Sequence, residues 1–277
     1  MSEKNSVIME VKNINLRFGG VIAIQDVSFN IFEGEIRAII GPNGAGKSSM
    51  LNVINGFYHP QEGEVWFNGE KRPSMEPYQI AKTGIARTFQ NIALFKGMTT
   101  IENVMTGRQL KMNKNFFWQM LRYGPAIDEE VQHRRRCEEI IDFLEINHIR
   151  KTPVGSLPYG LQKRVELARA LAMDPKILLL DEPTRALDIG HQQQAFELVE
   201  RLRREHGLTV ISAMQDLTLA GMYSERLALL HEGIVVADGL VEDVLSAETL
   251  AEFYGVRVTV HRENDGTVVV VPRRDQL

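Results

Sequence analysis

The sequence contains only one cysteine, Cys137, so no disulfide can form within the chain. It also lacks the set of neighbouring Cys and His residues that a zinc site requires. Scarcity of cysteine is typical of a reducing compartment, and we expect a cytosolic location. No apolar run approaches the roughly 20 residues that span a bilayer, and residues 1–10 contain no apolar signal core. Any role at a membrane is therefore expected to come through partner proteins.

An excess of basic residues is absent as well. The 32 Lys and Arg residues are outnumbered by 36 Asp and Glu residues, which gives a formal net charge of −4. This balance does not support a nucleic-acid-binding surface over the whole protein, because such surfaces are normally basic. The densest basic run, Arg134 to Arg136, is followed by Glu138 and Glu139, and we interpret it as the solvated face of a helix.

Short strand-like segments alternate with longer helical ones, a pattern that predicts an α/β fold. The apolar runs Ile36–Ile40, Ile177–Leu180 and Leu208–Ala213 are typical of buried strands in a parallel sheet. Residues 7–11 and 27–31 alternate between apolar and polar types, as half-exposed strands do. The 277 residues are therefore expected to form a layered domain with a sizeable core.

Two segments differ from this alternation. Residues 91–156 are long and helical in pattern, with large side chains such as Phe116, Phe117 and Trp118, and they predict an inserted helical subdomain. Residues 251–277 alternate valines around a tight turn, which predicts an appended β-hairpin. The nucleotide-binding core is then expected at about 1–90 and 157–250, within a single domain that spans residues 1–277.

A glycine-rich loop fits the phosphate-binding pattern G-x-x-x-x-G-K-[ST] at every specified position, and it stands between an apolar strand and a helical run. Its glycines allow backbone N–H groups to surround phosphates, and the following helix adds its positive N-terminal end. Lys47 is expected to pair with the β- and γ-phosphates, and Ser48 to bind Mg²⁺. The predicted ATP contacts in this loop are Gly41, Pro42, Asn43, Gly44, Ala45, Gly46, Lys47, Ser48 and Ser49.

Two adjacent carboxylates follow the apolar run Ile177–Leu180. Asp181, leaving a buried strand, is expected to hold Mg²⁺ through water. Glu182 is in a position to orient or deprotonate the attacking water, which is the role of a general base. Together with the phosphate loop, this pair predicts an ATPase.

These motifs and several spaced markers resemble the ABC transporter ATPase family over nearly the whole chain. Phe18 matches the aromatic residue that stacks on adenine, and Gln90 matches the catalytic-site glutamine that reaches Mg²⁺. The segment Leu157–Gln162 stands at the family's signature position, and Ala186–Asp188 matches the D-loop. The resemblance implies a P-loop cassette with a RecA-like, mainly parallel core, an antiparallel β subdomain and an inserted helical subdomain.

The resemblance also implies partners. In this family the signature loop faces the phosphate loop of a second ATPase subunit, so Tyr159 and Gly160 are expected to contact ATP across a dimer. The dimer would be a homodimer or a heterodimer and would dock on a membrane permease through the helical subdomain. The permease would receive its cargo from a substrate-binding protein. We expect the chain to lie on the inner face of the cell membrane without inserting into it and without binding nucleic acid.

Within the family, the chain is similar to two different subfamilies. The part up to about residue 183 resembles the ATPases of branched-chain amino acid importers, and the part from about residue 184 resembles those of iron-siderophore, haem and cobalamin importers. The segments that carry the first similarity are Leu16–Gly20, Gly34–Ala38, Gly56–Tyr58, Arg87–Gln90 and Leu157–Gly160. Those that carry the second are Arg185–Asp188, His206–Val210, Asp216–Ala220 and Ala251–Val256. A recombined gene, an engineered chimera and an unfamiliar branch of the family would each explain this mixture.

Three departures from the family pattern bear on the chemistry. Gln215 stands where the family has a histidine that contacts the γ-phosphate, and an amide carries no charge and moves no proton. Arg185 stands where a small serine is usual in the D-loop. In the signature, Pro158 and Tyr159 replace a serine and a glycine, a variant that the amino acid subfamily tolerates. We expect ATP binding with slowed hydrolysis.

The preferred hypothesis is the ATPase of an importer for branched-chain or other hydrophobic amino acids, because the expected docking region lies in the amino-acid-like part. The ATPase of an iron-siderophore, haem or cobalamin importer is the first alternative. A hydrolysis-impaired regulatory cassette is the second, and the intact Glu182 opposes it. A non-transport ABC protein is the third, and the single cassette without a coiled-coil insertion opposes that.

Overall fold

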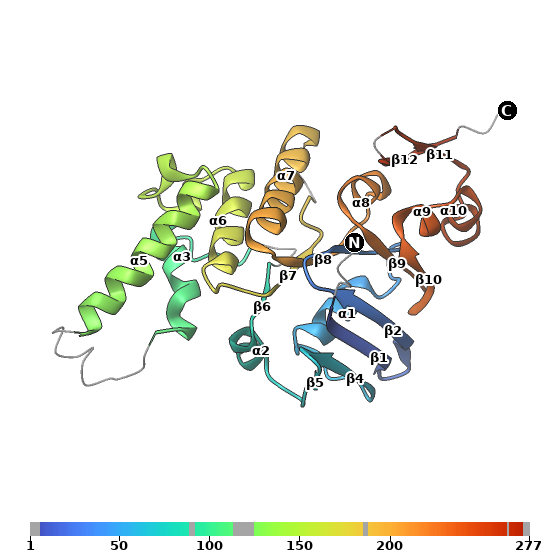
Figure 1. Cartoon of the computed structure of the whole chain (residues 1–277), viewed down its shortest axis with the longest axis horizontal. Coiled ribbons are helices and arrows are strands. Elements are labelled where there is room, and N and C mark those ends of the chain that lie inside the picture. Colours follow the sequence, from blue (N-terminus) through green and yellow to red (C-terminus); the bar gives the residue numbers. More distant parts are fainter. Residues whose placement is uncertain (1–5, 89–91, 113–124, 185–187, 265, 274–277) are drawn as a thin grey trace.

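The computed structural model describes residues 6–88, 92–112, 125–184, 188–264 and 266–273. The chain forms a layered α/β structure with its helical part at one end and its C-terminal elements at the other (Figure 1). Among the described residues, no helix is both long enough and apolar enough to cross a membrane.

A six-stranded sheet forms the centre of the molecule. Five of its strands run parallel, and the edge strand β10 is antiparallel to its neighbour. In spatial order the strands are β10 (Ile234–Leu240), β9 (Arg226–His231), β3 (Ile36–Ile40), β8 (Thr209–Ala213), β7 (Ile177–Asp181) and β6 (Ile85–Arg87). Every residue of β3, β7 and β8 is buried, which confirms the prediction of interior parallel strands from their apolar runs.

A four-stranded antiparallel sheet packs on one side of this centre. Its strands, in spatial order, are β2 (Val21–Phe32), β1 (Val7–Phe18), β4 (Glu62–Phe67) and β5 (Glu70–Lys71). Strands were expected at residues 7–11 and 27–31, and both are longer in the structure. The reason is a set of register shifts between β1 and β2, one of them around Asn13, which has a left-handed φ of 50°. Bulges of this kind break the alternation of apolar and polar residues, so the sequence pattern ends before the strand does.

The helix α1 (Lys47–Ile54) lies between the two sheets. Its buried residues Met50, Leu51 and Ile54 belong to one apolar cluster with residues from β1, β2 and the central sheet. Two further helices cover the central sheet, namely α7 (Ile189–His206) and α8 (Leu217–Tyr223). The short α2 (Pro77–Thr83) precedes β6.

The helical part shares an apolar core with α7 and with one face of the central sheet, including Ala86, Leu178 and Val210. It contains α3 (Thr100–Thr106), η1 (Gly107–Leu110), α5 (Pro125–Phe143), η2 (Asn147–Ile149), η3 (Val154–Ser156) and α6 (Tyr159–Leu171). An isolated bridge between Thr99 and Pro153 joins the two ends of the insertion. This closure agrees with an inserted helical unit, although its exact limits at 91 and 156 stay a prediction. The aromatic residues 116–118 lie outside the described residues.

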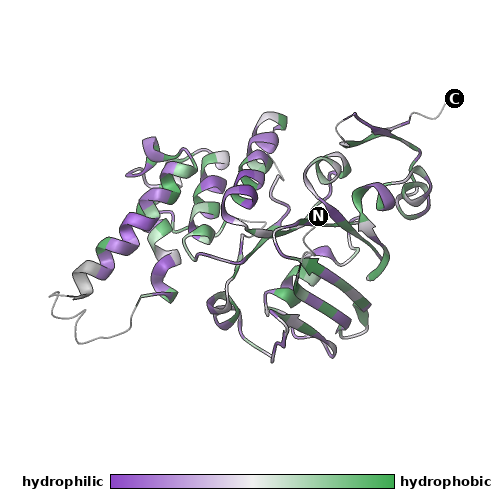
Figure 2. Cartoon of the chain, in the orientation of Figure 1, coloured by the Kyte–Doolittle hydropathy of each residue, from purple (hydrophilic) through white to green (hydrophobic). Residues whose placement is uncertain are grey.

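The solvent-facing side of the helical part is hydrophilic. In Figure 2 much of α5 is coloured as hydrophilic, whereas hydrophobic colours mark the strands of the sheets. The run Arg134–Arg136 lies on α5, where Arg134 and Arg135 form ion pairs with Glu138 and Glu139 one turn later. These exposed i,i+4 pairs agree with the interpretation of the basic run as a solvated helix face.

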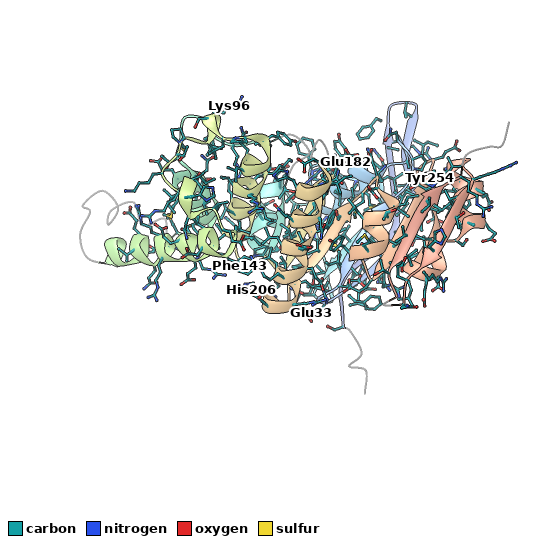
Figure 3. The ribbon with its side chains drawn as sticks, turned by 90° about the horizontal axis from the view of Figure 1, so that it is seen from above. Glu33, Lys96, Phe143, Glu182, His206 and Tyr254 are labelled. Atoms are coloured by element: carbon teal, nitrogen blue, oxygen red, sulfur yellow. The ribbon has the colours of Figure 1, made fainter. Side chains whose placement is uncertain are left out.

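Aromatic contacts join the helical part to α7. The ring of Phe143 at the end of α5 lies 5.4 Å from the ring of His206 at the end of α7 (Figure 3). The guanidinium of Arg201 stands over the same Phe143 ring at 4.3 Å. The end of α5 is therefore held against a helix of the core.

The C-terminal elements pack on the opposite end of the central sheet. They are α9 (Val241–Val244), α10 (Ala247–Tyr254), β11 (Val258–Arg262) and β12 (Val268–Pro272). The predicted hairpin is present as β11 and β12, but residues 251–254 belong to α10 and not to the hairpin. The side chain of Ser246 caps this helix, which ends at Gly255 with a φ of 64°. The hydroxyl of Thr218 on α8 donates to the carbonyl oxygen of Val270 at 3.1 Å and anchors the hairpin.

A cluster of charged side chains, of which only Arg108 is buried, fixes the C-terminal end of α6 within the helical part. The carboxylate of Asp174 accepts hydrogen bonds from Arg108, from Arg136 at 3.0 Å and from Lys111 at 3.2 Å. Arg108 is buried and also donates to the carbonyl oxygen of Ala172 at 2.7 Å. Burial by itself raises the pKa of Asp174, but the bonds from Arg108 and Arg136 outweigh it and lower the pKa overall.

The Asp174→Asn substitution is expected to lower the free energy of unfolding by about 0.5–2 kcal/mol at neutral pH, because the buried Arg108 loses its counter-charge while solvent screens the part of Asp174 that is exposed. Asparagine tolerates the left-handed φ of 45° at this position, so the change removes charge and little else. Urea unfolding of both proteins measures the difference, with the exposed Glu205→Gln as control. Because the folded pKa lies below the unfolded value of about 3.9, the difference should persist down to roughly pH 4 and shrink below it. Equal unfolding midpoints for the Asp174→Asn variant and the native protein at neutral pH would contradict this role.

Candidate active site

The phosphate loop and the predicted residues Asp181, Glu182 and Gln215 meet at the carboxyl ends of the parallel strands, where ligands of open α/β sheets bind. The phosphate loop follows β3, the carboxylates Asp181 and Glu182 follow β7, and Gln215 follows β8. Because these three strands are neighbours in the order β3-β8-β7, residues far apart in sequence come within contact distance.

Two glycines of the loop have positive φ values and lie so close to the backbone of other segments that a side chain would not fit. A Cβ atom on Gly41, which has a φ of 148°, would lie 2.1 Å from the carbonyl oxygen of Leu230. One on Gly46, with a φ of 102°, would lie 2.7 Å from the carbonyl oxygen of Ala23. Gly46 is also the N-cap residue of α1, so the loop leads directly into a helix N-terminus that favours anions.

The remaining loop residues leave a surface open to a ligand. Asn43 and Gly44 are exposed, whereas Ala45 is buried and its carbonyl oxygen accepts a bond of 3.2 Å from the amide of Gly233. Pro42 and Ser49 are half-buried. The loop is therefore supported from the β9–β10 turn and exposed at its tip.

Lys47 folds back over the loop. Its ammonium group donates to the carbonyl oxygens of Gly41 at 2.7 Å and Pro42 at 3.0 Å. Burial lowers the pKa of Lys47, and the nearby carboxylates of Glu182 and Asp181 oppose this effect. The ammonium thus stands between the loop and two carboxylates, where an incoming phosphate group could replace its carbonyl partners.

Ser48 and Asp181 form a pair of oxygen donors. The hydroxyl of Ser48 donates to Oδ1 of Asp181 at 3.0 Å, and Asp181 is buried. Hydroxyl and carboxylate oxygens are hard donors that suit Mg²⁺, which retains waters and takes phosphate oxygens when the protein supplies few ligands. No group of three His, Cys, Asp or Glu side chains suited to a metal occurs in the part of the chain that the structure describes. The oxygen donors of Ser48 and Asp181 therefore fit Mg²⁺ brought by a nucleotide.

Glu182 and Gln215 contact each other directly. The amide Nε2 of Gln215 donates to Oε1 of Glu182. Glu182 has a left-handed φ of 47°, and its own amide donates to the carbonyl oxygen of Ala213 at 3.0 Å. A left-handed φ is unfavourable for a residue with a side chain, and strained positions of this kind concentrate at functional sites. The carboxylate is thus oriented by the backbone of β8 and by Gln215.

Phe18 ends β1 and is 45% exposed, which leaves part of its ring open for stacking. The ring of Tyr58 meets Phe18 edge-on, with centroids 4.8 Å apart. Tyr58 follows α1 and so links the position of Phe18 to the helix that begins at the phosphate loop. This support was not anticipated from the sequence, because the contact joins residues 40 positions apart and no local pattern signals it.

The signature residues lie at the N-terminus of α6. Tyr159 is the first residue of the helix and is 40% exposed, and Gly160 follows it. The N-cap residue Pro158 makes no side-chain hydrogen bond to this helix. Gln90 and Arg185, two further residues that the sequence predicts to act at the site, lie outside the described residues.

Two side chains at the site had no predicted role. Arg87 at the end of β6 donates to Oδ2 of Asp181 at 2.7 Å and to Oδ1 of Asn52 on α1 at 2.6 Å. Arg87 is 94 positions from Asp181 and 35 positions from Asn52 in the sequence. No local sequence pattern therefore predicts a role for Arg87 or Asn52 at the site.

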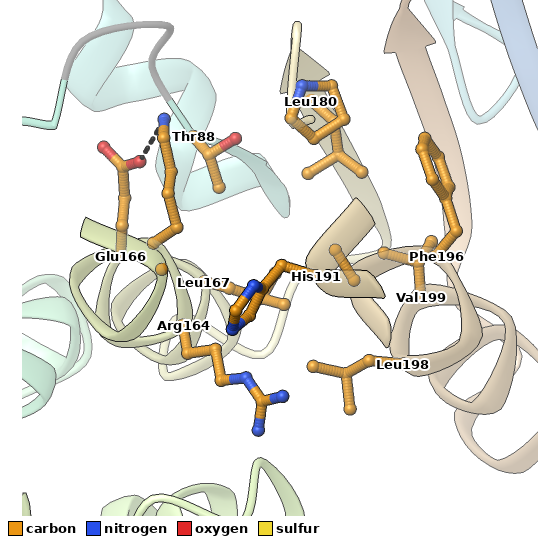
Figure 4. A pocket seen from close by; sticks show the side chains of 13 residues that line it. Thr88, Arg164, Glu166, Leu167, Leu180, His191, Phe196, Leu198 and Val199 are labelled. Carbon is orange, nitrogen blue, oxygen red and sulfur yellow. Dashed lines mark hydrogen bonds and ion pairs between the residues drawn. The ribbon is translucent and has the colours of Figure 1, made fainter. Parts of the chain in front are cut away.

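An apolar cavity of about 60 Å³ lies beside the site, between α6 and α7 (Figure 4). Residues that line it include Thr88, Gly160, Leu167, Leu180, Phe196 and Val199. No residue of the phosphate loop lines it. The cavity is therefore separate from the phosphate-binding surface, although it borders the segments that follow β6 and β7.

Comparison with known proteins identifies related sequences. Residues 24–185 match the family model described as ABC transporter. The chain is 32% identical over 237 residues to the high-affinity branched-chain amino acid transport ATP-binding protein BraF of Pseudomonas aeruginosa, covering 86% of this chain and 93% of BraF. It is 35% identical over 251 residues to the phosphonates import ATP-binding protein PhnC of Wolinella succinogenes, covering 90% of this chain and 88% of PhnC.

Solved structures are similar as well. The ADP conformation of MJ1267, an ATP-binding cassette of an ABC transporter, superposes with a TM-score of 0.79 at 32% identity and covers 90% of this chain and 98% of that one. A putative metal-chelate type ABC transporter in an inward-facing conformation gives a TM-score of 0.77 and covers 97% of this chain and 98% of that one. Its identity of 22% shows a shared fold only.

The Gly46→Ala substitution is expected to weaken nucleotide binding by roughly a hundredfold, because the added Cβ meets a backbone oxygen and the positive φ becomes strained. The dissociation constant of a fluorescent ATP analogue measures the effect. Gly20→Ala is the matched control, since Gly20 has open space around its Cβ position and no positive φ. Circular dichroism confirms that both variants are folded. Unchanged affinity in the folded Gly46→Ala protein would contradict the assignment of this loop.

Proposed function

The chain belongs to the ABC transporter family as an ATPase subunit, and we propose that it powers the uptake of branched-chain or other hydrophobic amino acids through a separate permease. The match to BraF, an amino acid transport ATP-binding protein, covers 86% of this chain and 93% of BraF. This similarity is the observation that carries the substrate class, because the transported molecule does not contact an ATPase subunit in this family.

ATP hydrolysis is proposed to use the residues around Asp181 and Glu182. Bound Mg²⁺ would neutralise phosphate charge from a position beside Ser48 and Asp181. Lys47 would hold the β- and γ-phosphates, and Phe18 would stack on adenine. Glu182 would orient the attacking water and accept its proton. The burial of Asp181 and Glu182 supports this arrangement, since a partly dehydrated site strengthens each electrostatic contact.

The presence of Gln215 supports the proposal that the chain hydrolyses ATP more slowly than a cassette with a histidine at this position. Its amide can orient Glu182 and donate a hydrogen bond to the γ-phosphate, but it supplies no positive charge as phosphate charge develops. In the structure the amide is already bonded to Glu182, so contact with a γ-phosphate would require this bond to be shared or broken. This contact also favours a second candidate function, in which the chain binds ATP as a regulatory cassette beside a more active partner.

Dimerisation is proposed to complete the site with Tyr159 and Gly160 of a second subunit. Exposed apolar side chains at the starts of α6 and α7 support this, because Tyr159 is 40% and Ile189 is 84% exposed. Large exposed apolar side chains near one another are typical of interaction surfaces.

Permease docking is proposed for the surface around the segment between β6 and α3. Phe95 and Met98 in this segment are 54% and 40% exposed, and Phe57 after α1 and Tyr78 on α2 are 62% and 56% exposed. A permease helix would cover these apolar side chains. Such docking would place the chain on the inner face of the membrane, and a substrate-binding protein would act on the other side.

Two alternatives for the cargo remain. PhnC, at a similar identity, is named as a phosphonates import protein, so ATPases of this similarity serve different cargoes. The iron-siderophore, haem or cobalamin alternative rests on the segments from residue 184 onward, such as Asp216–Ala220 and Ala251–Val256, that resemble those importers.

ATP turnover by the purified chain is expected to be measurable and to fall by roughly 10²–10⁴-fold in Glu182→Gln, because the general base is lost. Nucleotide affinity should be unchanged in that variant. Gln215→His is expected to raise turnover roughly tenfold, since a histidine can carry charge toward the γ-phosphate. Gln193→His, an exposed position on α7, is the control and should leave turnover as it is.

The outcomes separate the candidate functions. Turnover only in Gln215→His would favour the regulatory cassette, and no turnover in any variant would favour a protein that only binds ATP. No gain in Gln215→His over an active native chain would show that the glutamine does not limit the rate.

Uptake of radiolabelled leucine is expected to fall to background in cells that lack this chain. Uptake should return with the native gene but not with Glu182→Gln, which separates energy supply from assembly with the permease. Ferric siderophore uptake in the same cells is the parallel measurement. Normal leucine uptake together with lost siderophore uptake would replace the proposed cargo with the alternative one.

A further inference from the structure

Arg87 occupies a position that connects the phosphate-loop helix to the carboxylate of β7. It is the last residue of β6, which pairs in parallel with β7. Its two terminal nitrogens reach different elements, one to Oδ2 of Asp181 at 2.7 Å and one to Oδ1 of Asn52 at 2.6 Å. The side chains of Arg87 and Asp181 are each only 5% exposed.

The two carboxylate oxygens of Asp181 are thereby assigned to different partners. Oδ1 accepts from Ser48 at 3.0 Å and Oδ2 accepts from Arg87 at 2.7 Å. A carboxylate held at both oxygens cannot rotate freely, so Oδ1 stays directed toward the Ser48 hydroxyl. The planar guanidinium is well suited to this task because its donors form a rigid fork.

Charge adds a second effect. A guanidinium remains ionised in proteins, so Arg87 places a permanent positive charge against the carboxylate that is proposed to attract Mg²⁺. Buried ion pairs of this kind contribute little net stability, because the cost of removing both charges from water offsets their attraction. The Arg87–Asp181 ion pair therefore contributes little to the stability of the fold. Its main effect is on the electrostatic potential at the Asp181 carboxylate.

We infer that Arg87 is a positioning residue that fixes the orientation of Asp181 and lowers the affinity of its site for Mg²⁺. This inference rests on the proposed function, since it assumes that Ser48 and Asp181 receive Mg²⁺ together with ATP. Arg87 itself contacts neither the nucleotide nor the metal in this assignment. It acts through the carboxylate.

The position of Arg87 also ties Asp181 to the chain that leads to the helical part. The next residue, Thr88, is bonded through its amide to the carbonyl oxygen of Leu179 at 2.9 Å, and its side chain lines the cavity between α6 and α7 (Figure 4). Residues around a cavity can shift with less repacking than residues in a close-packed core. The guanidinium of Arg87 therefore belongs to a residue whose neighbour in the chain borders this cavity.

The test measures the Mg²⁺ concentration that gives half of the maximal enhancement of binding of a fluorescent ATP analogue. In Arg87→Gln we expect this concentration to fall roughly three- to tenfold, because a positive charge beside the metal site is removed. Turnover in the same variant should fall roughly tenfold, because the carboxylate loses its fixed orientation. Arg87→Lys keeps the charge and loses the fork, so its Mg²⁺ midpoint should match the native value while turnover still falls.

Arg72→Gln is the matched control. Arg72 is another largely buried arginine that contacts α1, where it donates to the carbonyl oxygens of Ile54 and, at 2.9 Å, Val53 at the end distant from the phosphate loop. Its removal should reduce thermal stability and leave the Mg²⁺ midpoint unchanged. An unchanged midpoint in Arg87→Gln, or an equal shift in Arg72→Gln, would overturn the inference. A native chain whose ATP binding does not respond to Mg²⁺ at all would instead overturn the proposed function on which it rests.

Discussion

The carboxylate of Asp181 is the point at which the separate parts of this molecule meet. It ends β7, receives the Ser48 hydroxyl from the phosphate-loop helix and receives the Arg87 guanidinium from the end of β6. A buried carboxylate is unfavourable unless it is paired and hydrogen-bonded, so this one constrains both neighbours to stay in register with β7. Two strands of the central sheet, β6 and β7, and the helix α1 thereby place a hard oxygen donor beside the phosphate loop.

The contact between Gln215 and Glu182 adds a neutral hydrogen-bond donor to this arrangement. A neutral amide holds the proposed base, while the positive charges nearby come from Lys47 and Arg87. Electrostatic assistance to hydrolysis would therefore come from the loop and from β6 more than from the segment after β8. This arrangement underlies the proposal that the chain hydrolyses ATP slowly.

Some of the structure could be predicted from sequence because its physical cause is local. The loop from Gly41 to Ser48 is specified by residues that tolerate positive φ and close approach, and buried parallel strands are specified by unbroken apolar runs. The full lengths of β1 and β2 could not be predicted, because a bulge near Asn13 interrupts the alternation. The roles of Arg87 and Tyr58 could not be predicted either, since each depends on a partner that only the folded sheet order brings close.

The most direct test of the role of Asp181 is the binding of Mn²⁺, as a paramagnetic substitute for Mg²⁺, followed by the loss of the free-ion signal in electron paramagnetic resonance. With ATP present, the native chain is predicted to bind one Mn²⁺ per chain more tightly than ATP does alone, and Ser48→Ala and Asp181→Asn are each predicted to lose that added affinity. Equal Mn²⁺ binding by the native chain and by both variants would show that the Ser48–Asp181 pair is not the metal site, and the central role given to Asp181 would be wrong.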